Sequence, residues 1–327
     1  MKQIRRTVVV GVILLSLTAG MAAALPAKTT FIELRGPTWS PSGKTIAYVR
    51  WREQPPRSPY PNATTTGQIW IANADGSHRH PVTSRMPIPR SLSWAPDGHA
   101  IVFTAGAGET KQGGFWTVDV RTRTLTNLEH SASNPIWSPD GTRIAYLTVG
   151  THGGELDVIP SNGGPPTYVA FYGGTPGASG MPLVWSPDSR YVEVFPYLYP
   201  SDGSGGYSET DAIRWSRNGA LKLTSDHTVV NVATGRVIGT VPSMIRPQLA
   251  PDGTAVAGTT LSGKVRIASV RTATITYTPG AQSANDTVSW SPRHQLAYVG
   301  SGRCGPRSQI NIFQTTGNAS RVLAKSC

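Results

Sequence analysis

Two segments of the chain concentrate arginine and aromatic side chains, the residue types that most often anchor binding interfaces. The first segment contains four prolines together with Arg50, Trp51, Arg52, Arg57 and Tyr60. The second is rich in glycine and contains Tyr197, Tyr199 and Tyr207. Both segments predict recognition of a partner by side chains on long loops. The alternative is that these side chains only cover one end of the fold.

Motifs for nucleotide, acyl-transfer or metal chemistry are weak. Gly43-Lys44-Thr45 resembles the end of a phosphate-binding loop, but the glycine required five residues earlier is Thr38. The segment 177–181 is one glycine short of a nucleophile elbow. His78 and His80 lie close in sequence without an evident third metal ligand. We therefore expect no catalytic residue, no metal and no cofactor.

A hydrolase for sugars or lactones would need several carboxylates that meet at one place in the fold. The chain has 18 acidic residues, and those outside the repeated turns described next show no regular spacing. Glu53, Glu109, Glu193 and Glu209 are examples. A pair of acids that meets near the axis stays open as an alternative.

A recurring phrase indicates which elements position these side chains. Six copies occur, and they begin with Trp39-Ser40-Pro41-Ser42-Gly43, Trp94-Ala95-Pro96-Asp97-Gly98, Trp137-Ser138-Pro139-Asp140-Gly141, Trp185-Ser186-Pro187-Asp188-Ser189, Leu249-Ala250-Pro251-Asp252-Gly253 and Trp290-Ser291-Pro292-Arg293. A β-prone run such as Ile-Ala-Tyr follows most copies. Repeats at this spacing, about 40–50 residues, are typical of propellers and solenoids.

The phrase has the chemistry of a turn that ends one strand and starts the next. Proline fixes φ, aspartate bonds the backbone and glycine accepts a positive φ. Asp97, Asp140, Asp188 and Asp252 therefore belong to turns. Five tryptophans recur in phase, which predicts packing between blades rather than a ligand cage: Trp39, Trp94, Trp137, Trp185 and Trp290.

Two further strands follow each pair, so the repeat is a four-stranded antiparallel unit. Such a unit buries both faces only against its neighbours, which favours an all-β propeller. Six third strands are recognisable, and we expect six blades. A further phrase at 215–219 then falls within a long insertion of blade four. Seven blades are the alternative.

The tryptophan-led phrase with its Ile-Ala-Tyr run resembles the β-propeller repeats of TolB-like proteins, from about Pro37 to the C-terminus. The resemblance implies a fold and not an activity, because the matching residues make turns and packing. TolB-like proteins carry an α/β domain before the propeller, for which residues 25–36 are too few. The repeats also resemble propellers that precede a serine peptidase domain, but we expect no hydrolase domain after Cys327.

The N-terminus has the pattern of an export signal. Lys2, Arg5 and Arg6 precede an apolar run, and Ala22 to Ala24 suit cleavage. We expect a leader at 1–24, a short lead-in at 25–36 and one propeller domain at 37–327. An uncleaved membrane anchor is the alternative, since the apolar run is just long enough to span a bilayer. The mature chain is then secreted, periplasmic or attached to the cell envelope.

The formal net charge of +12 suits attraction to an anionic envelope polymer. The basic residues are scattered, however, and no aromatic-interleaved basic stripe indicates nucleic acid. Cys304 and Cys327 predict one disulfide in an exported chain. We expect a monomer.

The variable loops all follow the second strand of a repeat, so they open on one rim: 50–67, 104–114, 148–154, 196–226 and 300–308. We expect an exported, non-enzymatic scaffold that binds a protein, a peptide or an envelope polymer at this rim. The alternative is a propeller hydrolase of glycosidase or lactonase type.

Overall fold

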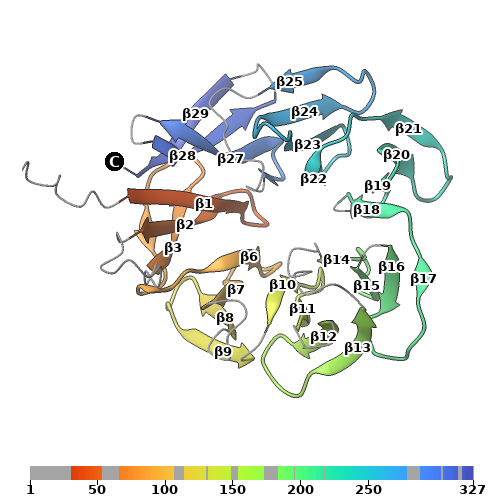
Figure 1. Ribbon diagram of the computed structural model, residues 1–327, viewed down its shortest axis with the longest axis horizontal. Helices are drawn as coiled ribbons and strands as arrows, with labels where there is room; N and C mark the ends of the chain where they lie inside the picture. Colours follow the sequence, from red (N-terminus) through yellow and green to blue (C-terminus); the bar gives the residue numbers. More distant parts are fainter. Residues whose placement is uncertain are drawn as a thin grey trace, which may run out of the picture.

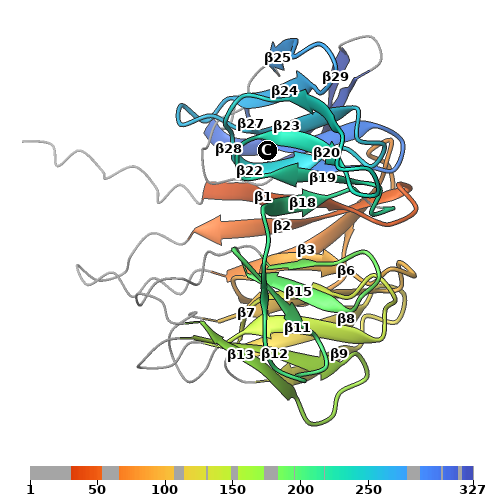
Figure 2. The same ribbon diagram turned by 90° about the vertical axis from the view of Figure 1, so that its right-hand side faces the viewer.

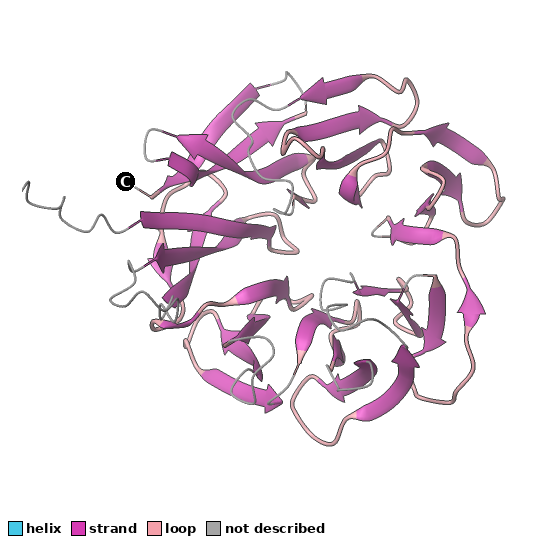
Figure 3. Ribbon diagram, viewed as in Figure 1, coloured by secondary structure: helices cyan, strands magenta, loops and turns pink. Residues whose placement is uncertain are grey.

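The computed structural model describes residues 31–53, 66–106, 114–129, 132–148, 154–172, 183–194, 196–216, 218–277, 288–302, 305–315 and 319–326. Every regular element in these ranges is a β-strand (Figure 3). Within the same ranges, no helix has the length and apolar character needed to cross a bilayer. The strands form seven antiparallel sheets arranged around a common centre (Figure 1).

The first four sheets are as follows. Blade 1 contains β1 (Phe31–Trp39), β2 (Thr45–Glu53), β3 (Thr66–Asn73) and β4 (His80–Pro81), and the short β5 (Met86–Pro87) also pairs with β3. Blade 2 contains β6 (Arg90–Trp94), β7 (Ala100–Ala105), β8 (Gly114–Asp119) and β9 (Leu125–Glu129). Blade 3 contains β10 (Ser133–Trp137), β11 (Arg143–Leu147), β12 (Gly154–Pro160) and β13 (Thr167–Tyr172). Blade 4 contains β14 (Leu183–Trp185), β15 (Tyr191–Val194), β16 (Tyr197–Pro200) and β17 (Ser208–Glu209).

The last three sheets complete the ring. Blade 5 contains β18 (Ala212–Trp215), β19 (Leu221–Thr224), β20 (Thr228–Asn231) and β21 (Val237–Thr240). Blade 6 contains β22 (Ile245–Leu249), β23 (Ala255–Thr259), β24 (Val265–Ser269) and β25 (Ile275–Tyr277). Blade 7 contains β26 (Ser289–Trp290), β27 (Gln295–Gly302), β28 (Gly305–Gln314) and β29 (Ala319–Lys325). Figure 2 shows the strands lying across the thickness of the disc.

The structure confirms an all-β propeller of four-stranded antiparallel blades and corrects the preferred count from six blades to seven. The expected insertion at 196–226 is not a loop. It contains the outer strands β16 and β17 of blade 4, then the inner strands β18 and β19 of blade 5. The short β16 is followed by a glycine-rich run, and β17 has only two residues, so neither gives a clear strand pattern.

The tryptophan-led phrase closes the innermost hairpin of each blade. Its tryptophan is the last residue of the first strand, as at Trp94, and the proline, aspartate and glycine follow as a turn. The Gly98 N–H donates to the carbonyl of Ala95 at 2.9 Å, and Gly98 has φ of 75°. The Asp97 carboxylate accepts the His99 N–H at 2.8 Å. Trp215 ends β18 in the same way, so the seventh phrase is a true repeat.

The same tryptophans connect neighbouring blades. The indole N–H of Trp94 donates to the carbonyl of Thr38 in blade 1 at 3.1 Å. The indole N–H of Trp185 donates to the backbone carbonyl of Ile136 in blade 3 at 3.2 Å, and that of Trp290 donates to the backbone carbonyl of Gln248 in blade 6 at 3.0 Å. In each case the acceptor directly precedes the first residue of the phrase in the previous blade. One sequence position therefore supplies both packing and a directional contact.

The ring closes between blades 1 and 7 without a shared strand, because each sheet uses consecutive strands. The Trp39 N–H donates to the Ser289 hydroxyl at 3.1 Å, which repeats the bond from Trp137 to Ser93 between blades 3 and 2. One apolar cluster joins Leu34 and Tyr48 of blade 1 to the buried face of blade 7. Side-chain packing thus holds the first blade to the last.

The indole bonds predict a difference between two buried tryptophans. Trp94→Phe removes the indole donor to the Thr38 carbonyl, whereas the Nε1 of buried Trp39 has no partner among the described residues. We expect Trp94→Phe to lower the free energy of unfolding by about 1 kcal/mol more than Trp39→Phe. Urea denaturation of both variants measures this difference. Equal losses would contradict a role for the indole bond.

Candidate functional site

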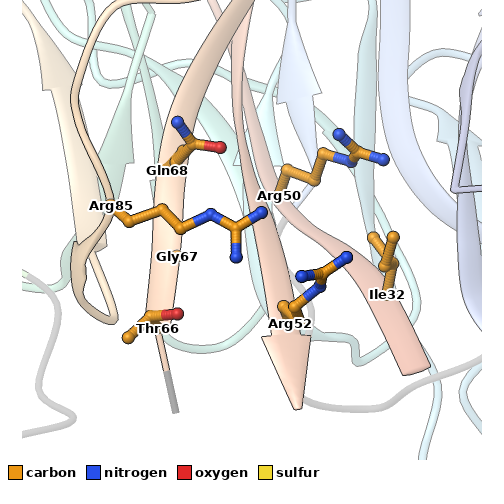
Figure 4. Close-up of a pocket in the computed structure, with 7 residues that line it drawn as sticks. All are labelled: Ile32, Arg50, Arg52, Thr66, Gly67, Gln68 and Arg85. Atoms are coloured by element: carbon orange, nitrogen blue, oxygen red, sulfur yellow. The ribbon is translucent and has the colours of Figure 1, made fainter. Parts of the chain in front are cut away.

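Three arginines converge on a small hollow in blade 1 (Figure 4). Arg50 and Arg52 alternate along β2 and share one face of the sheet with Tyr48, which packs toward blade 7. Arg85 reaches the hollow from the segment between β4 and β5. The cavity volume is about 30 Å³. Its other lining residues are Ile32, Thr66, Gly67 and Gln68.

The local sheet explains this convergence. Arg52 is paired with Ile32 on β1 and Thr66 on β3, and Arg50 is paired with Gln68. The β5 strand pairs with Thr66 and Gly67, which brings the preceding Arg85 beside them. The Arg50 guanidinium lies 5.2 Å from the centre of the Trp70 ring. This stacking orients the guanidinium without neutralising its charge.

Trp51 points to the opposite face of β2 and belongs to a separate contact. The guanidinium of Arg35 lies 3.5 Å from its ring centre. The Glu33 carboxylate accepts bonds from Arg35 at 2.8 and 2.5 Å and lies 3.6 Å from Arg307 of β28. Glu33, which follows the lining residue Ile32, therefore already pairs with Arg35 and Arg307, and its pair with Arg307 links blades 1 and 7.

The three expected tyrosines also come together, but in blade 4. The ring of Tyr197 lies 4.7 Å from that of Tyr207 and 6.2 Å from that of Tyr199. Tyr199 is buried, and Tyr207 is exposed. Tyr197 and Tyr199 lie on the strand β16 rather than on a loop, which corrects the sequence interpretation. Burial raises the pKa of Tyr199, and the neighbouring tyrosines, Tyr168 of blade 3 included, act in the same direction.

The two expected clusters do not form one site. β2 and β16 lie on opposite sides of the ring (Figure 1). Arg57, Tyr60, Cys304, Cys327 and the expected leader lie outside the described residues. Sequence reasoning missed Arg85, Thr66 and Gln68, because only the pairing of three strands brings them beside Arg50 and Arg52.

The innermost strands carry polar residues where they bulge. Ser91 and Asn134, each three residues before a phrase tryptophan, have φ of 52° and 50°. The Ser91 hydroxyl donates to the side-chain carbonyl of Asn134 at 3.1 Å across blades 2 and 3. No group of three His, Cys, Asp or Glu side chains suited to a metal occurs among the described residues.

Blades 4 and 5 meet through charged groups. Six apolar clusters of described residues join the other six neighbouring pairs of blades. On β15, Glu193 is 2% exposed. Burial raises the pKa of Glu193 from 4.5 to about 7, although the positive charge of Arg214 on β18 acts in the opposite direction. The Glu193 carboxyl between blades 4 and 5 therefore changes its protonation state near neutral pH.

No protein-family model matches the chain. A segment of 129 residues, 39% of the chain, is 28% identical to "Uncharacterized peptidase YuxL" of Bacillus subtilis (strain 168). The match covers only 19% of that protein's length. The chain therefore spans a small part of this curated relative.

Solved propellers share the fold at low sequence identity. TolB from Acinetobacter baumannii matches with a TM-score of 0.51 and 19% identity, over 86% of this chain and 63% of that one. The propeller domain of the Trilobed protease from Pyrococcus furiosus, described as having an open velcro topology, gives 0.59 and 13% identity, over 90% and 96%. Pyrococcus horikoshii acylaminoacyl peptidase gives 0.59 and 14%, over 90% and 53%.

These comparisons confirm the resemblance to TolB-like propellers at the level of the fold. They contradict the expectation of a non-enzymatic scaffold, because the sequence relative and two of the structural neighbours are named as peptidases or proteases. These names also differ from the glycosidase or lactonase type of hydrolase that the sequence analysis gave as the alternative. The names agree better with the hydrolase of the alternative than with the scaffold, and the matched region is a propeller.

The buried carboxylate predicts a pH dependence of stability. The pKa of Glu193 in the folded chain, about 7, exceeds its ordinary value of 4.5. Between these values the folded chain binds the extra proton, so stability falls as pH rises, by roughly 3 kcal/mol over the window. Glu193→Gln should remove this fall. Urea denaturation from pH 4.5 to 8 measures the difference between the two slopes, and parallel curves would refute the assignment.

Proposed function

We propose that this propeller binds peptides for a peptidase-type hydrolytic reaction. The observation that carries the proposal is the 28% identity over 129 residues to a protein named as a peptidase. The likeness of the fold to the propellers of an acylaminoacyl peptidase and the Trilobed protease agrees with it. This reaction class replaces the sugar or lactone hydrolysis that the sequence left open as the alternative.

Two surfaces support peptide binding. In blade 4, Tyr197 is partly exposed and Tyr207 is exposed, and Tyr168 of blade 3 is 54% exposed. Such rings bind apolar side chains at little cost in conformational entropy. The hollow of blade 1 offers guanidinium donors. A peptide carries both kinds of group, whereas a plain sugar carries no charge for the arginines.

Several expectations from the sequence remain proposals. We propose that the propeller, expected at 37–327 and beginning with β1 (Phe31–Trp39), acts as one domain and as a monomer. We also propose that the chain works outside the cytoplasm, since its first 24 residues have the pattern of a leader. The disulfide between Cys304 and Cys327 belongs with that compartment.

Incubation of the full chain with a library of short peptides tests the proposal. Mass spectrometry detects cleavage, and calorimetry detects binding. We expect saturable binding of a subset of peptides, and weaker binding after Tyr207→Ala, because Tyr207 is the most exposed ring of its cluster. Val322→Ala, at an exposed position of blade 7, is the matched control. The proposal fails if no peptide is bound or cleaved.

A further inference from the structure

The hollow of blade 1 combines three positive charges with no acid among its lining residues. Within the described part of the chain, no carboxylate lies within ion-pair distance of Arg50, Arg52 or Arg85. Like charges that share a face repel one another and lower stability. The nearby Glu33 is bonded to Arg35 on the other face, so among the described side chains it does not compensate these charges.

The shape of the hollow limits what can fill it. Its volume of about 30 Å³ has room for one or two water-sized groups. Arg50 and Arg52 are only partly exposed, and Arg85 is exposed at the mouth. Guanidinium groups bind carboxylates through pairs of parallel N–H···O bonds. A single carboxylate matches both the space and the donors.

We propose that Arg50, Arg52 and Arg85 bind the carboxylate of a peptide, either its C-terminus or an acidic side chain. This proposal rests on the proposed function and names a chemical feature of the peptides. Arg50 is oriented by its stacking on Trp70. Gln68 is held by a bond from its amide to the Thr83 carbonyl at 3.3 Å, so the wall opposite Arg50 is also fixed. Arg85 completes the site from the exposed side.

Calorimetry with four probes tests the proposal on the full chain. The probes are an N-acetylated alanine tetrapeptide with a free C-terminus, its C-terminal amide, the amide with one internal glutamate, and inorganic phosphate. The free-acid peptide and the glutamate peptide distinguish the two sources of carboxylate. We expect at least one of them to bind about tenfold or more tightly than the plain amide.

Arg52→Gln with Arg85→Gln should weaken that binding by about tenfold or more, since hydrogen bonds to charged groups are lost. Arg236→Gln with Arg271→Gln is the matched control. Both arginines are exposed and lie away from the hollow: Arg236 is in blade 5, and Arg271 follows β24 in blade 6. It removes the same charge and should leave binding nearly unchanged. Thermal melts give a second readout: a carboxylate probe should raise the melting temperature of the wild type and not of the Arg52/Arg85 variant.

Three results would overturn the proposal. Equal binding of the amide and the free-acid peptides would show that the carboxylate is not recognised, while peptide binding itself would stand. Binding of phosphate without any peptide carboxylate would assign the hollow to a different anion. Absence of all peptide binding and cleavage would remove the proposed function together with this inference.

Discussion

The fold depends on closing the ring between its first and last blades without a strand shared between them. Many rings of repeated units would gain from a strand shared between the two ends, but here each blade uses four or more consecutive strands. The contact must therefore come from apolar side chains and a few directional bonds. The Trp39 N–H donates to the Ser289 hydroxyl, just as the Trp137 N–H donates to the Ser93 hydroxyl of the preceding blade. Blade 7 therefore contacts blade 1 as each blade contacts the one after it. Closure repeats the ordinary blade-to-blade contact.

That closure also positions the candidate site. Ile46 and Tyr48 on β2 pack against blade 7, and the next residues on the same face are Arg50 and Arg52. The first half of β2 thus contributes apolar side chains to the core, while its second half presents charged side chains. Cation–π stacking on Trp70 and the pairing of β5 with β3 then fix the arginines around one small volume. A site built on strands of a packed blade is more rigid than one on a free loop.

The sequence predicted the fold well where turn chemistry repeats and poorly where strands are short. The phrase at Trp94 shows its strand, turn and packing contact plainly, because tryptophan, proline, aspartate and glycine each have one physical role there. The phrase at Trp215 has arginine and asparagine in place of proline and aspartate, and no third strand is recognisable between it and the phrase at Trp185, so the sequence predicts an insertion there. The neighbouring β16 and β17 were hidden for the related reason that four-residue and two-residue strands carry little periodicity.

The candidate site was only half visible in the sequence. Arg50 and Arg52 stood out by composition, but Arg85 lies more than thirty residues away, and sheet pairing alone brings it near. The most direct measurement of the central claim is a crystal structure of the chain with a peptide that has a free carboxylate. We expect the carboxylate oxygens within about 2.7–2.9 Å of guanidinium nitrogens of Arg50, Arg52 or Arg85. A peptide bound elsewhere, with the hollow empty or filled by a side chain of the protein, would contradict the account.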